Sequence, residues 1–186
     1  MTEALAKRRL GRTDFYVTAL GMGGAWLGST PEGYDETVAV ETVLRALELG
    51  INLLDTSGAY EGGQSEQFIG KALELWYARG GKREDLILST KTGTRTRPHD
   101  YSAEGTRKSI ETSLEMLKTD YLDIALVHDP DNLKPVLAPG CAWDVLKEYK
   151  KKGVVRAIGL GVRNQAFHRR MIATGDCDVC LTHSDY

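Results

Sequence analysis

The sequence predicts an α/β protein whose parallel strands form a (β/α)8 barrel, the TIM-barrel architecture, and three observations favour this fold. Short apolar segments alternate with helical ones along the chain, as in a parallel sheet covered by helices. Asp55, Lys91 and His128 each follow an apolar segment at nearly equal intervals, which suits the repeated units of a barrel. The competing open dinucleotide-binding sheet needs Gly-x-Gly-x-x-Gly after a strand, but Trp26 and Asn164 occupy the third glycine position of the two candidate turns.

The predicted strands are short runs of apolar residues, and the first of them leads into a glycine turn at 21–24. Runs of this length between turn signals are typical of strands buried on both faces. The expected strands are Val17–Leu20, Ile51–Leu54, Leu86–Thr90, Leu122–Val127, Val154–Ile158 and Val179–Thr182.

The predicted helices lie between these strands and carry apolar residues three and four positions apart. Glycine follows two of them, at Gly50 and Gly153, because glycine tolerates the left-handed geometry of a helix end. Glu66 falls in a first helical turn, where a negative charge is favourable. Ser102 is a suitable N-cap. The expected helices are Thr37–Leu49, Ser65–Leu75, Ser102–Leu117, Ala142–Lys151 and Gln165–Ala173.

Composition limits the class of protein. The 186 residues are 41% hydrophobic and 27% charged, with a net charge of −2, which suits one globular domain over residues 1–186. No basic excess indicates a nucleic-acid partner, no apolar run of about 18 residues indicates a membrane span, and the opening residues lack the apolar core of a secretory signal. Three cysteines are too few for a disulfide scaffold, so we expect a cytoplasmic protein. Cys177 and Cys180 have the spacing of a zinc or redox pair, but a buried cysteine beside a strand is the simpler interpretation.

Four polar residues meet at one end of the predicted barrel. Active sites of such barrels lie at the carboxyl ends of the strands and in the loops that follow. Asp55, Lys91 and His128 take such positions, and Tyr60 follows Asp55 in the next loop. Each residue alone has an ordinary structural explanation, such as a turn, a surface aromatic or a solvated charge. Together they predict one active site, and no set of metal ligands competes with them.

Several motifs in this sequence resemble those of the aldo-keto reductases. The stretch from Asp55 to Tyr60 resembles the Asp-x-x-x-x-Tyr motif of the family. Ser89-Thr90-Lys91 resembles its lysine strand, and Tyr121 to His128 resembles its histidine strand. Arg9 to Thr13 resembles the N-terminal hairpin that caps the lower end of the barrel.

The resemblance implies an enzyme that moves hydride between a nicotinamide cofactor and an aldehyde, ketone or aldose sugar. Tyr60 would act as general acid in reduction and as base in oxidation. A free phenol is a weak acid at neutral pH, and the nearby Lys91 cation should favour its ionised form. Asp55 would hold Lys91, and His128 would orient the carbonyl. The rival interpretation is a regulatory subunit that keeps the fold and senses the cofactor without turnover.

The resemblance also suggests residues that contact the cofactor and the substrate. The cofactor is expected to be NADP, with NAD as the alternative, and to contact Gly23, Asp55 and Asn164. The alternative role of Asn164 is that of an ordinary helix N-cap. Trp26 and His183 are candidates for the wall of the substrate pocket, and no metal is expected. The turn at 159–162 looks similar to that of sugar dehydrogenases of the family, such as those that oxidise galactose-like aldoses.

The strand count predicts an incomplete barrel. Six strand segments are recognisable, whereas a complete barrel has eight and typically needs about 250 residues. We therefore expect Tyr186 to be a truncation point, and we expect these residues alone not to form a stable monomer that binds the cofactor tightly. The open edges invite self-association, or a partner chain could supply the remaining strands.

Overall fold

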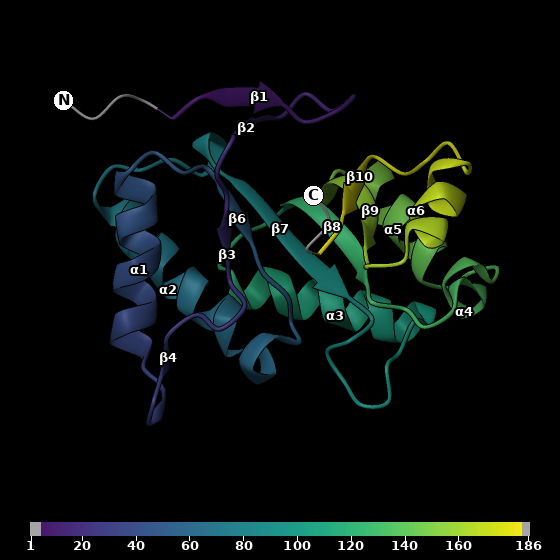
Figure 1. Cartoon of the computed structure of the whole chain (residues 1–186), viewed down its shortest axis with the longest axis horizontal. Helices are drawn as coiled ribbons and strands as arrows, with labels where there is room; N and C mark the ends of the chain where they lie inside the picture. Colours follow the sequence, from purple (N-terminus) through teal and green to yellow (C-terminus); the bar gives the residue numbers. More distant parts are fainter. Residues whose placement is uncertain (1–4, 184–186) are drawn as a thin grey trace.

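The computed structural model describes residues 5–183, and its centre is a six-stranded parallel sheet curled into half of a barrel (Figure 1). The order across the sheet is β10-β9-β8-β7-β6-β3. Neighbouring strands all run parallel, which confirms the predicted α/β barrel architecture. The strands are β3 (Met22–Gly23), β6 (Leu53–Asp55), β7 (Ile87–Thr92), β8 (Leu122–His128), β9 (Val155–Gly161) and β10 (Val179–Leu181).

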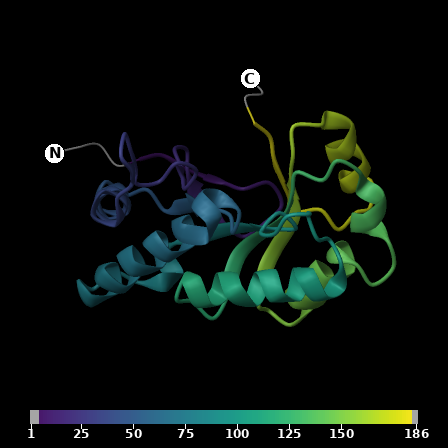
Figure 2. The same ribbon diagram turned by 90° about the horizontal axis from the view of Figure 1, so that it is seen from below.

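Helices flank the outer face of the sheet (Figure 2). The five predicted helices are confirmed, and the Ser102 hydroxyl caps one of them by accepting a hydrogen bond from the Gly105 amide at 3.1 Å. The five helices are α1 (Glu36–Glu48), α2 (Gln64–Ala78), α3 (Ala103–Met116), α5 (Ala142–Lys151) and α6 (Gln165–Ile172). A short helix α4 (Leu133–Leu137) and 3-10 turns η1 (Tyr60–Gly63) and η2 (Arg83–Asp85) were not predicted, because such short segments show no helical periodicity. Within residues 5–183, no helix combines the length and apolar character needed to cross a bilayer.

The N-terminal hairpin changes the assignment of the first strand. β1 (Lys7–Arg9) pairs antiparallel with β2 (Tyr16–Thr18), so the hairpin is confirmed, but the prediction of a barrel strand at Val17–Leu20 is wrong. The Asn52 side chain binds β2 instead, accepting from the Thr18 amide at 2.7 Å and donating to the Tyr16 carbonyl at 2.8 Å. The first barrel strand is β3, too short and too rich in glycine to show an apolar pattern. A second small hairpin joins β4 (Ser29–Thr30) to β5 (Gly33–Tyr34).

The sheet separates two hydrophobic cores. The larger one lies between the sheet and the helices, with Leu54, Leu88 and Ile158 facing outward. The smaller one lies inside the half-barrel, where hairpin residues pack on the first inward-facing residues of the strands. Its buried members are Phe15, Val17, Ile87, Ile124, Leu126 and Ala157. The hairpin therefore closes one end of the half-barrel, and the carboxyl ends of the strands lie at the other.

The three cysteines are free thiols. Cys177 packs in the outer core, and burial raises its pKa to about 12. Its sulfur lies 3.9 Å from that of exposed Cys180. The burial of Cys177 among apolar residues supports its interpretation as a core residue.

One buried carboxylate joins three strands near the hairpin end. Asp123 in β8 is 0% exposed and accepts from the Leu88 amide at 2.9 Å. It also accepts from Arg83 at 2.8 Å and from Arg156 in β9 at 2.7 Å. A buried charge that has so many partners becomes costly for the fold when any of them is lost.

We predict that Asp123→Ala lowers the free energy of unfolding by roughly 3–5 kcal/mol, because the change leaves the half-buried Arg83 without its counter-charge. Chemical denaturation followed by circular dichroism measures the loss. The control is Glu36→Ala, which removes an ion pair to Lys71 whose two side chains are about half exposed and should cost at most about 1 kcal/mol. Equal losses in the two variants would contradict the prediction.

Candidate active site

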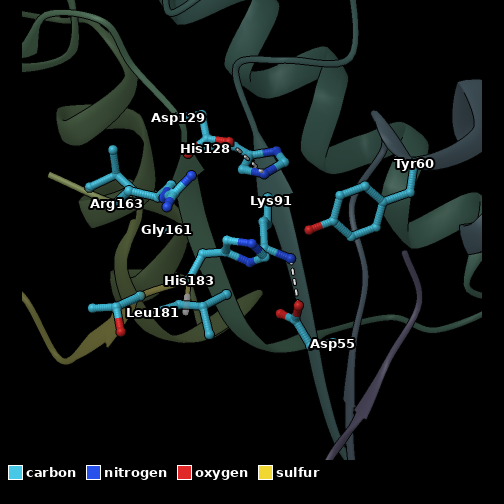
Figure 3. Close-up of a pocket in the computed structure, with 11 residues that line it drawn as sticks. Asp55, Tyr60, Lys91, His128, Asp129, Gly161, Arg163, Leu181 and His183 are labelled. Carbon is cyan, nitrogen blue, oxygen red and sulfur yellow. Dashed lines mark hydrogen bonds and ion pairs between the residues drawn. The ribbon is translucent and has the colours of Figure 1, made fainter. Parts of the chain in front are cut away.

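Alternation along registered strands brings three polar residues to one end of the half-barrel. Asp55, Lys91 and His128 lie at or near the carboxyl ends of β6, β7 and β8. Each falls on the inward-facing set of its strand, since alternate residues face the same side. With Tyr60 from η1 they line a cavity of about 370 Å³ (Figure 3). The structure thus brings together all four residues that the sequence singled out.

Lys91 is a buried ammonium with defined partners. Its side chain is 1% exposed, and its Nζ donates to Asp55 Oδ2 at 2.6 Å and to the Thr56 carbonyl at 2.7 Å. Ser89, two residues earlier on the same face, donates to Asp55 Oδ1 at 2.7 Å. Asp55 therefore holds the ammonium while Ser89 holds Asp55. The ammonium lies 4.7 Å from the centroid of the Tyr60 ring.

A compact turn after β6 carries Tyr60. Glu61, Gly62 and Gly63 all have positive φ, a conformation that glycine adopts without strain. Gly58 allows close approach of a neighbour, because a Cβ there would lie 2.2 Å from Cζ of Arg95. The Glu61 carboxylate accepts from the Trp26 amide at 2.8 Å and so connects this turn to the loop after β3.

His128 is buried and sits edge-on to Tyr60, with ring centroids 5.6 Å apart. Its Nδ1 lies 2.7 Å from Thr94 Oγ1 and 3.1 Å from Ser57 Oγ, and its Nε2 lies 3.5 Å from Asp129 Oδ2. Burial, followed by the positive charge of Lys91, lowers the pKa of His128 to about 3. The ring is therefore neutral at pH 7 and can act as a hydrogen-bond donor or acceptor but not as a cation.

The remaining predicted site residues are placed differently. His183 lines the cavity. Gly23 ends β3 beside Asp55, with which it is in register, but neither it nor Trp26 is among the residues that line the cavity. Trp26 is 73% exposed. Asn164 caps α6 by accepting from the Ala166 amide at 3.0 Å, which is the alternative that the sequence left open.

Two residues near the site have surroundings that the sequence did not predict. Arg163 lines the cavity after β9, and its place just past a strand end could have marked it. Glu66 lies in the first turn of α2 as predicted, but its side chain is 0% exposed. It accepts from Thr90 at 2.6 Å, from Ser113 at 2.7 Å and from Arg95 at 2.6 Å. Those partners come from other segments, so periodicity within α2 could not reveal them.

The cavity has the size and the polar lining of a site for a small molecule. Its volume is in the range of small-molecule sites. Besides the four central residues it is lined by residues after β8, around the end of β9 and around the end of β10, namely Asp129, Gly161, Val162, Arg163, Leu181, Thr182 and His183. Arg163 offers a cation that suits an anionic group, and the neutral His128 with the Tyr60 hydroxyl offers donors that suit a carbonyl oxygen.

Comparisons with known proteins show which family and fold the chain resembles. The family model described as Aldo/keto reductase family matches residues 19–179. L-galactose dehydrogenase of Arabidopsis thaliana is 38% identical over 184 residues, which cover 96% of this chain and 56% of that protein. The NADH-specific methylglyoxal reductase of Escherichia coli is 30% identical over 94% of this chain and 57% of its own length. The aldo-keto reductase of Bacillus halodurans, solved in its holo form, superimposes with a TM-score of 0.75 at 32% identity, covering 94% of this chain and 55% of that one. The chain spans about half the length of the curated relatives that it matches.

We predict a pH dependence of stability that depends on His128. The folded protein excludes a proton down to pH about 3, whereas the unfolded chain binds it below pH about 6.5. The free energy of unfolding should therefore fall as pH falls through this window, by up to about 1.4 kcal/mol per pH unit from this group. His128→Gln should flatten that slope in denaturation curves measured from pH 7 to pH 4. The exposed His183→Gln serves as the control, and an equal slope in wild type and His128→Gln would contradict the prediction.

Proposed function

The chain belongs to the aldo/keto reductase family. From that premise we propose that it functions as an oxidoreductase that uses a nicotinamide cofactor on aldehydes, ketones or aldose sugars. The observation that carries the proposal is the buried Lys91–Asp55 ion pair beside the Tyr60 phenol, in a cavity that also holds the neutral His128. A bound cofactor would supply or accept the hydride, so the protein must handle the proton and hold the oxygen.

Tyr60 is the proposed proton donor and acceptor. In reduction its hydroxyl gives a proton to the substrate oxygen, and in oxidation the phenolate takes that proton back. The Lys91 ammonium, 4.7 Å from the ring centroid, stabilises the negative charge that develops on the phenol oxygen. Asp55 acts by holding Lys91, because their contact of 2.6 Å fixes where the cation lies. His128 contributes a neutral polar edge that orients the substrate oxygen.

We infer the substrate class and the cofactor from the relatives and from the lining of the cavity. The similarity to a protein named L-galactose dehydrogenase favours an aldose sugar as substrate. NADP remains our proposed cofactor. NAD is the alternative, because one relative is named as NADH-specific. Arg163 and His183 would lie beside the cofactor or the substrate, because both line the cavity. We place the protein in the cytoplasm, and its three free thiols support this.

The alternative of a regulatory subunit without turnover predicts a different result. A subunit that only senses the cofactor has no need of a proton donor supported by a buried cation. The presence of Tyr60, Lys91, Asp55 and His128 around one cavity therefore favours the enzyme. Absorbance of the reduced cofactor, followed with a panel of aldehydes, ketones and sugars, separates the two possibilities.

We expect Tyr60→Phe to lower kcat by about 100-fold or more, because general acid–base catalysis contributes roughly 10²–10⁴-fold. The change removes one hydroxyl and little volume, so the circular dichroism spectrum and cofactor affinity by fluorescence titration should stay the same. Tyr34→Phe, in the small hairpin of β4 and β5, is the matched control and should retain full turnover. A Tyr60→Phe enzyme with wild-type kcat would exclude Tyr60 as the acid.

We also expect Lys91→Met to lower kcat and to move the optimum for oxidation to higher pH. Without the cation the phenolate is less stable, so a higher pH is needed to form it. Asp55→Asn should act in the same direction but more weakly, because it disturbs only the position of Lys91. Rates measured across pH on a good substrate test this, and an active Lys91→Met variant with an unchanged profile would rule out the coupling between Lys91 and Tyr60.

A further inference from the structure

Two buried hydroxyl groups converge on the same nitrogen of His128. Thr94 Oγ1 lies 2.7 Å from Nδ1 and Ser57 Oγ lies 3.1 Å from it. Ser57 is 0% exposed and Thr94 is 6% exposed. The other ring nitrogen, Nε2, has a carboxylate oxygen of Asp129 at 3.5 Å, and His128 and Asp129 both line the cavity (Figure 3). Hydroxyl groups therefore surround Nδ1, whereas a carboxylate and the cavity lie beside Nε2.

The hydrogen bonds that the Ser57 and Thr94 hydroxyls can make decide which nitrogen of the neutral ring is protonated. In a neutral imidazole one nitrogen donates and the other accepts. If Nδ1 carried the proton, the hydroxyl protons of Ser57 and Thr94 would both need acceptors elsewhere, and none is recorded for either in the part of the chain that the structure describes. If Nδ1 carries no proton, its single lone pair accepts from the Thr94 hydroxyl along the short contact, and the Ser57 hydroxyl can share it at the longer distance, so at most one hydroxyl proton lacks a full partner instead of two. Buried hydroxyl protons without an acceptor are costly, so the second arrangement is favoured.

Two further contacts agree with a proton on Nε2. Ser57 Oγ already accepts a hydrogen bond from the Ala59 amide at 3.1 Å, so its own proton is available for donation. The Asp129 carboxylate is 59% exposed and lies 3.5 Å from Nε2. Its negative charge favours the tautomer in which Nε2 carries the proton. Both sides of the ring thus favour the same tautomer.

We propose that Ser57 and Thr94 are positioning residues that fix His128 as the tautomer with its proton on Nε2, so that the ring presents an N–H donor to the substrate oxygen. This inference rests on the proposed function, since it supplies the donor that orients a carbonyl beside the Tyr60 hydroxyl. A carbonyl oxygen accepts from two donors at once, and it would therefore be held between the phenol and the imidazole. An oxygen so held gains from both donors as negative charge develops on it.

The two hydroxyls lie close in sequence to other site residues. Ser57 precedes Tyr60 in the loop after β6, and Thr94 lies in the loop after β7, three residues past Lys91 of that strand. Ser57 also supports the turn before Tyr60 through the Ala59 amide, so a change at Ser57 affects more than the ring. Thr94 makes its recorded side-chain hydrogen bond to His128, so Thr94→Val is the cleaner test because it keeps the shape and removes the hydroxyl.

Nitrogen-15 NMR of the full chain labelled at histidine reads the tautomer without cofactor or substrate. The signals of His128 are assigned by their loss in His128→Gln. We expect a pyrrole-type shift at Nε2 and a pyridine-type shift at Nδ1 in the wild type. A pyrrole-type shift at Nδ1 would overturn the proposal, and this wild-type spectrum decides the question even where a variant does not fold.

The variants then connect the tautomer to turnover. The double change Ser57→Ala with Thr94→Val should give averaged nitrogen shifts, because the ring exchanges between tautomers. Thr94→Val alone should lower kcat roughly tenfold, since one orienting donor is only partly populated, and Thr94→Ser should restore both the shifts and kcat. Thr96→Val is the matched control in the same loop, because Thr96 bonds only to the Pro98 carbonyl, and it should change neither.

The outcomes separate this proposal from the proposed function. Unchanged shifts in the double variant, or changed shifts with a wild-type kcat in Thr94→Val, would overturn the positioning role. Wild-type turnover in Tyr60→Phe would instead overturn the proposed acid while leaving the tautomer of His128 as measured. The two results come from different residues and different instruments, so one can fail without the other.

Discussion

Strands in parallel register, with successive side chains facing opposite sides, are the constraint on which the rest of this structure depends. β6, β7 and β8 pair so that Asp55, Lys91 and His128 all project from the inner side of the half-barrel near the strand ends. Residues on the opposite faces fill the outer core with the helices. A slip of one residue would exchange these two sets, placing the polar side chains against the helices and the apolar ones in the cavity. The hydrophobic core therefore fixes the geometry of the site.

The electrostatics of the cavity follow from that placement. A buried ammonium is tolerated because Asp55 and the Thr56 carbonyl satisfy it, and a buried charge without such partners would be strongly unfavourable. The same cation, added to burial, keeps His128 neutral. The site thus holds one charge pair and one uncharged ring, and a neutral ring has a tautomer that hydroxyl groups can select. The charge at Lys91 and the hydroxyls at Ser57 and Thr94 thereby act on the same imidazole.

A second buried ion pair supports the loop that carries Tyr60. The Glu66 carboxylate accepts from Arg95 at 2.6 Å, and the Arg95 guanidinium lies directly against Gly58, leaving no room for a side chain there. Glu66 also accepts from hydroxyls of β7 and α3. This network connects α2, α3 and the loops after β6 and β7. The turn before Tyr60 therefore packs, at Gly58, against an arginine that a buried carboxylate holds in place.

The sequence by itself determined the alternation of strands and helices and the four residues of the site, because periodicity, helix ends and the residue after a strand are local features. It could not assign Val17–Leu20 correctly, since that segment is as apolar as a barrel strand. In the folded chain β2 pairs antiparallel with β1 in the hairpin, and the Asn52 side chain, 34 positions from Thr18, binds it there. It left Asn164 between two roles, and the folded chain shows it capping α6. The place of Arg163 just past β9 is visible in the sequence. The burial of Glu66 and the hydroxyls around His128 were decided by tertiary structure alone, because each depends on segments that are distant in sequence and meet only when the sheet curls.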